Sequence, residues 1–488
     1  MPHPSRATTT ALLTTAALTL ALSACAVGPN HVRPVVAMPE RFVEAPPATN
    51  ADAPLPTVDA AFWRDFGDPQ LDALIERTLA ANHDLRIALA QYDRANALLR
   101  GAKFDRLPTI TGSASASDSR SSADQLPGVS RKDRDVESYA AAANAAWELD
   151  VFGRIRRGVE AGRADAAAGA ADLAAAQVAI VGEVARTYFE LRGLQERLRV
   201  AQENADTQRE TLRLVEARFK AGADSEFDAA RARAQQASTA SRIPALEAQI
   251  AIAMHRLAVL SGQTPDALVG DLSTPKALPS LPDRIDAGTP GDLLRRRPDI
   301  AAAEARLHAA TARVGVATAD LFPRFTLGGL IGSQAIDSDA LFKRDSETRL
   351  VSFGIDWSFL DVGRVRARIA AADADASGAL AGYERTVLLA LEDTENALVR
   401  HTRAREEDTL LAQAAQDSTA AAALARKRYQ AGATGLLELL DAERTRLQAQ
   451  DAFADARTRT TTSAVALYKA LAGGWPDAPP MRERVGQR

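Results

Sequence analysis

The stretch Trp147-Glu148-Leu149-Asp150-Val151-Phe152-Gly153-Arg154 recurs 210 residues later as Trp357-Ser358-Phe359-Leu360-Asp361-Val362-Gly363-Arg364. The same offset relates Arg218-Phe219-Lys220-Ala221-Gly222 to Arg428-Tyr429-Gln430-Ala431-Gly432. Ordered matches at a constant offset indicate an internal duplication, and this duplication decides the fold.

The matches continue toward the start of each half at a slightly larger offset. Asn82-His83-Asp84-Leu85 corresponds to Arg297-Pro298-Asp299-Ile300, 215 residues later. Leu107-Pro108 corresponds in the same way to Phe322-Pro323. The five-residue difference falls between Pro108 and Trp147, which places it in a loop of the first half.

Each half is predicted to contain one very long helix. No proline interrupts residues 155–220 or 365–430. At about 1.5 Å per residue, each continuous helix would be roughly 100 Å long. The glycines at 222 and 432 follow these stretches in the position of a helix C-cap.

The helices that return from these turns are predicted to be shorter. They span about 225–260, where Pro244 should bend the helix, and about 436–471. A long helix needs a partner along its whole length, so the helices near 71–102 and 293–319 should supply the missing part. We therefore expect short helices stacked end to end beside each long one.

Four segments alternate between apolar and polar residues, the pattern of strands. They are centred on Ile110–Ala116, Tyr139–Leu149, Phe325–Ile331 and Val351–Phe359. Such segments suit a transmembrane β-barrel with an apolar outer face, although a half-buried soluble sheet fits the alternation equally well. Residues 112–136 and 331–350 are expected to form the outward loops.

Four strands are too few to close a membrane barrel, because the smallest bacterial barrels have eight. A barrel must then be shared between chains. Two chains would give eight strands around a side-chain-filled interior, and three would give twelve strands around an open lumen.

The N-terminus has the features of a lipoprotein signal. Arg6 is the only charge before an apolar segment, 11–22, that is too short to span a bilayer. Leu22-Ser23-Ala24-Cys25 resembles a lipobox, in which the cysteine receives diacylglycerol and an N-acyl chain. The alternative is an ordinary signal peptide with a chance cysteine. Ala26 follows where an aspartate would favour the inner membrane, which points to the outer membrane.

The composition gives little support for an enzyme. Cys25 is the only cysteine, the six histidines are scattered, and no nucleophile, phosphate-binding or dinucleotide motif is present. We expect no catalytic residue, no metal site and no cofactor other than the lipid on Cys25. The net charge of −4 shows no bias toward nucleic acid.

The chain resembles the TolC-like outer-membrane factors, in particular the OprM/NodT-type efflux lipoproteins. The marks of the resemblance are the lipobox, Gly28-Pro29-Asn30, Trp63-Arg64-Asp65-Phe66-Gly67-Asp68-Pro69-Gln70-Leu71, Asn82–Leu85, Leu294–Ile300 and both Gly-Arg turns. The resemblance implies a mainly α-helical protein with a transmembrane β-barrel. Its duplicated helix–strand–strand–helical-hairpin units would form a trimeric α-barrel and a shared twelve-stranded outer-membrane barrel.

The resemblance also implies partners and a location. A homotrimer, lipid-anchored in the outer membrane and extending into the periplasm, would connect to a periplasmic adaptor (a membrane fusion protein) and an inner-membrane pump of the proton-driven RND type. Its function would be the outer-membrane channel of a tripartite efflux system. The alternatives are a duct for type I protein secretion and a periplasmic coiled-coil scaffold that forms no pore.

The same resemblance places the gate and the adaptor contacts at the helix turns. The adaptor-facing tips would be Lys220, Ala221, Gly222, Gln430, Ala431 and Gly432. Glu438 and Asp441, one helical turn apart, would contribute six carboxylates around the threefold axis, and Tyr429 would link the tip helices. The alternative for Glu438 and Asp441 is a solvated face neutralised by Arg444 and Arg446.

The predicted organisation follows from the duplication. It comprises a lipoprotein signal peptide over 1–24, a lipid-anchored segment over 25–60, a first repeat over 61–270, a linker over 271–290, a second repeat over 291–474 and a C-terminal tail over 475–488.

Overall fold

The computed structural model describes residues 26–44, 61–279, 281, 285 and 287–472. The predicted signal peptide, Cys25 and the C-terminal tail lie outside the described residues. The chain divides into two compact units. The sheet unit comprises Met1–Val35, Tyr92–Gly169 and Ala302–Glu384, and the helical unit comprises Val36–Gln91, Ala170–Ala301 and Arg385–Arg488.

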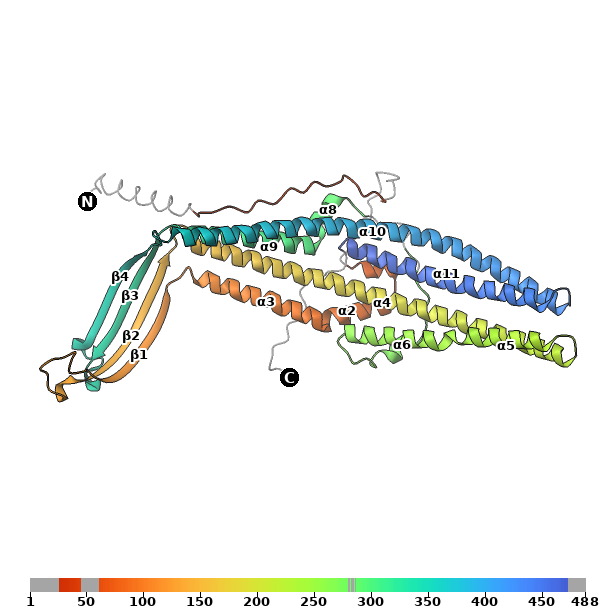
Figure 1. Cartoon of the computed structure of the whole chain (residues 1–488), viewed down its shortest axis with the longest axis horizontal. Coiled ribbons are helices and arrows are strands. Elements are labelled where there is room, and N and C mark those ends of the chain that lie inside the picture. The colour runs from red at the N-terminus through yellow and green to blue at the C-terminus, as the bar shows by residue number, and fades with distance from the viewer. Residues whose placement is uncertain (1–25, 45–60, 280, 282–284, 286, 473–488) are drawn as a thin grey trace, which may run out of the picture. The chain divides into compact units, whose positions relative to one another are not determined.

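Helices dominate the chain, as predicted (Figure 1). In chain order the elements are η1 (Phe62–Phe66), α2 (Pro69–Ala81), α3 (His83–Phe104), β1 (Thr109–Arg120), η2 (Lys132–Arg134), β2 (Asp135–Leu149), α4 (Arg154–Lys220), α5 (Glu226–Ala240), α6 (Arg242–Leu260), α7 (Val269–Leu272), α8 (Pro290–Arg296), α9 (Pro298–Ala319), β3 (Arg324–Ala335), η3 (Ser338–Ala340), η4 (Arg344–Ser346), β4 (Glu347–Asp356), α10 (Val362–Gln430) and α11 (Leu436–Ala470).

The two predicted long helices are confirmed. Helix α4 has 67 residues and α10 has 69. The first return helix is interrupted at Ser241, which separates α5 from α6. Pro244 lies in the first turn of α6, where its missing N–H and its clash with the preceding turn explain the interruption.

The sheet unit contains one antiparallel sheet with the strand order β1-β2-β3-β4, which confirms the predicted number of strands. The pairing is continuous over most of each strand: β1 pairs with β2 from Thr109↔Ala146 to Arg120↔Asp135. Both faces of β1 are exposed in the single chain. This exposure agrees with a sheet completed by other copies of the chain.

The predicted loops were too long. Residues 112–120 continue β1, so the first connection begins at Ser121, and residues 331–335 and 347–350 belong to β3 and β4. The Ser- and Gly-rich composition suggested a loop, but alternating small polar side chains also suit a strand face that contacts water. At its far end β4 stops at Asp356, before Trp357 and Phe359.

The repeated tryptophans make equivalent hydrogen bonds in both halves of the sheet unit. The Trp147 indole N–H donates to the Arg106 carbonyl at 3.0 Å, and the Trp357 indole donates to the Leu321 carbonyl at 3.0 Å. Each carbonyl lies just after a helix, α3 or α9. The duplicated motif therefore ties the end of a helix to the end of a strand.

The helical unit shows how the short helices meet end to end. The Asn82 side chain, between α2 and α3, donates to the Leu260 carbonyl at the end of α6 (2.8 Å). Arg297, between α8 and α9, donates to the Ala470 carbonyl at the end of α11 (2.9 Å). These carbonyls lack partners within their own helices, so each contact caps a helix end. The predicted stacking is confirmed.

The core of the helical unit is aromatic around η1. Phe62 stacks on Tyr468 with ring centroids 4.9 Å apart, and Phe66 lies 4.8 Å from Phe189. Asp68 then accepts the Gln70 N–H as N-cap of α2, and Tyr188 donates to the same carboxylate. This arrangement accounts for the local sequence Trp63–Leu71, which turns the chain into α2.

Two helical segments are long and apolar enough to cross a membrane by length and composition alone. They are Arg154–Lys220 and Glu226–Leu260, each with 39% of its most apolar window buried. Core helices pass the same test, and α4 and α6 pack against each other through Val181, Ile250 and Leu257. Packing in this core explains the buried share of their apolar residues.

The buried His401 makes the stability of the helical unit depend on pH. Its ring contacts the Ser463 hydroxyl at 3.0 Å, and burial, with Arg405 nearby, lowers its pKa to about 4. Between pH 6.5 and 4 the folded state then binds fewer protons than the unfolded chain. The free energy of unfolding should therefore decrease by about 3 kcal/mol per chain as the pH falls through this window.

We expect His401→Gln to flatten the dependence of the unfolding temperature on pH between 6.5 and 4. The exposed His83 offers a matched control, since His83→Gln should keep the parent's pH dependence. An unchanged pH profile in the His401 variant would contradict this assignment.

Candidate functional site

The two helix turns of the helical unit have the same local structure. In the first, the Ala223 N–H donates to the Arg218 carbonyl at 2.9 Å, and Gly222 has a φ of 78°. In the second, the Ala433 N–H donates to the Arg428 carbonyl at 2.8 Å, and Gly432 has a φ of 70°. Glycine adopts this left-handed conformation without strain, which explains both helix ends.

All six residues predicted as adaptor-facing tips are exposed. They are Lys220, Ala221, Gly222, Gln430, Ala431 and Gly432. Exposure makes them available to another protein, and their role in docking stays a prediction.

Tyr429 links the two turns of one chain. Its ring is buried, and its hydroxyl donates to Asp224 Oδ2 at 2.6 Å. The Arg218 guanidinium binds the same carboxylate at 3.0 Å and lies over the Tyr429 ring, 4.8 Å from its centroid. Burial and the contact with Asp224 raise the pKa of Tyr429, so its hydroxyl remains a donor at physiological pH.

Glu438 and Asp441 lie exposed on the first turns of α11. The residues between them, Leu439 and Leu440, are buried in the tip core, so the helix turns both carboxylates outward. Asp441 binds Arg444 at 2.5 Å, but both side chains are about 60% exposed, and such pairs contribute little. Their role in a gate stays a prediction.

Arg446, the second cation proposed to neutralise these acids, points elsewhere. Its guanidinium donates to Asn204 Oδ1 on α4 at 2.9 Å. Burial lowers its pKa. Of the two arginines that could neutralise Glu438 and Asp441, Arg444 binds Asp441, whereas Arg446 binds Asn204 instead.

A buried ion pair between α10 and α11 was not predicted from the sequence. Glu443 is 1% exposed; its carboxylate accepts from Arg426 at 2.8 Å and from the Thr211 hydroxyl at 3.0 Å. Arg426 also donates to Thr211 at 3.1 Å. The three side chains join α10, α11 and α4, and a buried charge of this kind depends on its partners.

A second unpredicted cluster holds the N-terminal segment in the sheet unit. Arg157, on α4, donates to the carbonyls of Val27 and Gly28 at 3.2 Å and to Asn30 Oδ1 at 2.7 Å. A side chain on Gly28 would meet the Gly315 backbone at 2.4 Å. These contacts account for the Gly28-Pro29-Asn30 motif, and Cys25 directly precedes the docked segment.

Within the described residues, no group of three or more His, Cys, Asp or Glu side chains could hold a metal ion. The polar clusters around Glu443 and Arg157 consist of ion pairs and hydrogen bonds that join helices to one another or to the N-terminal segment.

The chain matches a protein-family model described as "outer membrane efflux protein" over residues 74–263 and 289–473. The two matched segments correspond to the two halves of the duplication. Among similar curated proteins, the pyoverdine export outer membrane protein OpmQ of Pseudomonas putida is 35% identical over 95% of this chain and 98% of its own length. The nodulation protein T of Rhizobium leguminosarum bv. trifolii is 32% identical over 88% and 90%.

Solved structures show the same fold. The outer-membrane channel OprN is 41% identical and superposes with a TM-score of 0.86, covering 92% of this chain and all of the OprN chain.

Proposed function

The chain belongs to the outer membrane efflux protein family, and we propose that three copies of it form the exit channel of a tripartite efflux system. The observation that carries this proposal is the four-stranded sheet, which needs strands from further copies to close, on a chain that resembles an outer-membrane channel over nearly its whole length. The relative OpmQ is a pyoverdine export outer membrane protein, and the chain itself is an outer-membrane channel protein.

Partners of this channel are proposed from the same evidence. The exposed helix tips would receive a periplasmic adaptor, and the adaptor would connect the channel to a proton-driven inner-membrane pump. A duct lacks a discriminating pocket, so the pump selects the cargo. Type I protein secretion remains the second candidate, since it would use the same duct with a different pump.

Export is tested by deleting the gene and measuring accumulation of a panel of dyes, antibiotics and metals. We expect accumulation of at least one class to rise and to return to normal on complementation. Unchanged accumulation of all of them, together with loss of a secreted protein, would favour the secretion duct.

We also propose that Cys25 carries diacylglycerol and an N-acyl chain. The docked segment Ala26–Asn30 supports this, because the Val27 N–H donates to the Phe152 carbonyl at 3.2 Å, close to the end of β2. The acylated residue would then emerge beside the predicted membrane-spanning sheet, and several acyl chains suffice for stable anchoring.

Cys25→Ala is expected to abolish incorporation of labelled fatty acid. The parent chain, expressed to the same level, gives the positive control. Persistent labelling of the alanine variant would contradict the anchor, and an unlabelled parent would favour an ordinary signal peptide.

A further inference from the structure

The segment that follows Cys25 is docked against α4 and α9. A side chain on Gly153, directly before α4, would meet Ala26 at 2.7 Å, and a side chain on Gly28 would meet Gly315 of α9 at 2.4 Å. We call this contact the N-terminal dock. Both close approaches lie beside the residue that we propose carries the lipid, so the headgroups of the membrane should lie level with the N-terminal dock.

The duplication defines a second place of the same kind. Subtracting 215 from the residue numbers converts α9 into α3, and adding 210 converts α4 into α10. In a ring of three chains the counterpart of the N-terminal dock therefore lies between α10 of one copy and α3 of the next. We call it the interchain site.

The interchain site lacks the residues that hold the N-terminal segment. Gly315, which the segment approaches most closely, corresponds to Arg100. Arg157, which donates to the segment's carbonyls, corresponds to Ala367. An arginine thus stands where the segment needs a glycine, and the cation that binds the segment is replaced by a methyl group. The interchain site therefore suits a different occupant.

The part of the interchain site that α3 supplies is basic. Arg100 and Lys103 are exposed, and neither side chain makes an ion pair or a hydrogen bond with another residue that the structure describes. Residues 100–106 contain three basic residues and a single acid, Asp105. The corresponding residues 315–321 contain one acid and no basic residue. The positive charge is therefore specific to the interchain site.

Arg366 of α10 adds a cation from the neighbouring copy. Its counterpart in the first repeat, Arg156, binds Asp150 at 3.2 Å. Leu360 stands in the place of that aspartate and is 89% exposed, and the Arg366 side chain has no ion-pair partner among the described residues. Trp357 is also exposed. Cations beside exposed apolar and aromatic side chains are typical of the boundary between lipid headgroups and acyl chains.

We propose that the interchain site binds the headgroup of an anionic phospholipid of the outer membrane. Arg100 and Lys103 of one copy and Arg366 of the next donate to its phosphate, because guanidinium and ammonium groups form charge-assisted hydrogen bonds with phosphate oxygens. Leu360 contacts the acyl chains. The inference rests on the proposed function, because the interchain site exists only in a ring of chains at one membrane surface.

Native mass spectrometry of the purified full chain in detergent tests the proposal. The protein is titrated with phosphatidylglycerol, which is anionic, or with phosphatidylcholine, which is zwitterionic, and the lipid molecules bound to each trimer are counted. The basic-site variant combines Arg100→Gln, Lys103→Gln and Arg366→Gln. The mass of the complex shows whether each variant still assembles.

Two further variants separate the interchain site from the net charge of the protein. The helix-turn control combines Lys220→Gln, Lys427→Gln and Arg428→Gln, which removes the same charge from exposed residues near the two helix turns. Leu360→Asp restores the acid that the first repeat has at this place, and it removes no cation.

We expect the parent trimer to bind three phosphatidylglycerol molecules about tenfold more tightly than phosphatidylcholine. The basic-site variant should lose this preference, and Leu360→Asp should reduce it about fivefold, because the new carboxylate competes with phosphate for Arg366. The helix-turn control should keep the preference of the parent.

A trimeric parent without the preference would overturn the inference. So would an unchanged basic-site variant, an equal loss in the helix-turn control, or displacement of the bound lipid by inorganic phosphate at the same concentration. A parent that does not assemble into trimers would instead overturn the proposed function, and the inference with it.

Discussion

Replacing Arg426 with alanine is expected to destabilise the helical unit by about 3 kcal/mol, because Glu443 is then left buried without its cationic partner. Glu443 is 1% exposed and has Arg426 at 2.8 Å, so its carboxylate depends on the guanidinium to compensate its charge. The unfolding temperature of the detergent-solubilised protein, followed by its helical circular dichroism, should fall by about 5 °C.

Two controls isolate the buried charge as the cause. The double replacement Arg426→Leu with Glu443→Leu removes both charges and should recover most of the lost stability. Glu216→Ala changes the position that corresponds to Arg426 in the first repeat, where the counterpart of Glu443 is the exposed Arg233, and should cost less than about 0.5 kcal/mol. Equal losses from Glu216→Ala and Arg426→Ala would contradict the role of the buried pair.

Replacing Glu438 and Asp441 with alanine is expected to increase cation leak through the channel in planar bilayers, about tenfold. In a threefold ring these two positions contribute six carboxylates, which bind cations and oppose free passage at a constriction. Both side chains are exposed and so are available to such a ring.

Glu226→Ala is the matched control for this leak. Glu226 is an exposed acid on the first turn of α5, the helix that follows the other tip, and it binds Arg233 at 2.7 Å. Its removal should leave the leak unchanged. If the double variant conducts like the parent, or if Glu226→Ala leaks equally, the acidic residues of the second tip have no special role in the gate.

The sequence alone predicted the fold well where a long pattern was present. Sixty-six residues without proline, followed by a glycine turn, allow one long helix in each half, and both long helices are found. The strand ends could not be placed, because alternation of Ser, Gly and Ala in residues 112–120 suits a polar strand face as well as a loop.

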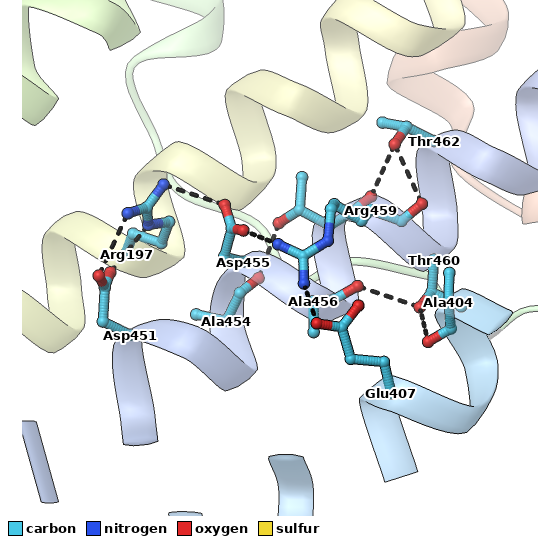
Figure 2. Close-up of polar contacts among 11 residues, drawn as sticks. Arg197, Ala404, Glu407, Asp451, Ala454, Asp455, Ala456, Arg459, Thr460 and Thr462 are labelled. Carbon is cyan, nitrogen blue, oxygen red and sulfur yellow. Dashed lines mark hydrogen bonds and ion pairs between the residues drawn. The ribbon is translucent and has the colours of Figure 1, made fainter. Parts of the chain in front are cut away.

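The polar contacts between helices were mostly not predictable. Tyr429 was assigned to a link between tip helices, but its partner Asp224 was not identified, since a contact between the two repeats has no local signal. Nothing in the sequence distinguishes Glu443 from the other acidic residues of its helix. The seven-residue spacing of Arg197, Asn204 and Thr211 was the available signal for the polar contacts that α4 makes with α11, and Figure 2 shows those of Arg197.

The proposed trimeric channel is tested most directly by single-channel recording from the purified full chain in planar bilayers, with its subunit number fixed by chemical cross-linking. We expect particles of three chains that give discrete, cation-preferring conductance steps, and these steps should be larger when Glu438 and Asp441 are replaced with alanine. Folded, membrane-inserted particles that never conduct, with or without these acids, or conduction by a single chain, would contradict the proposed channel.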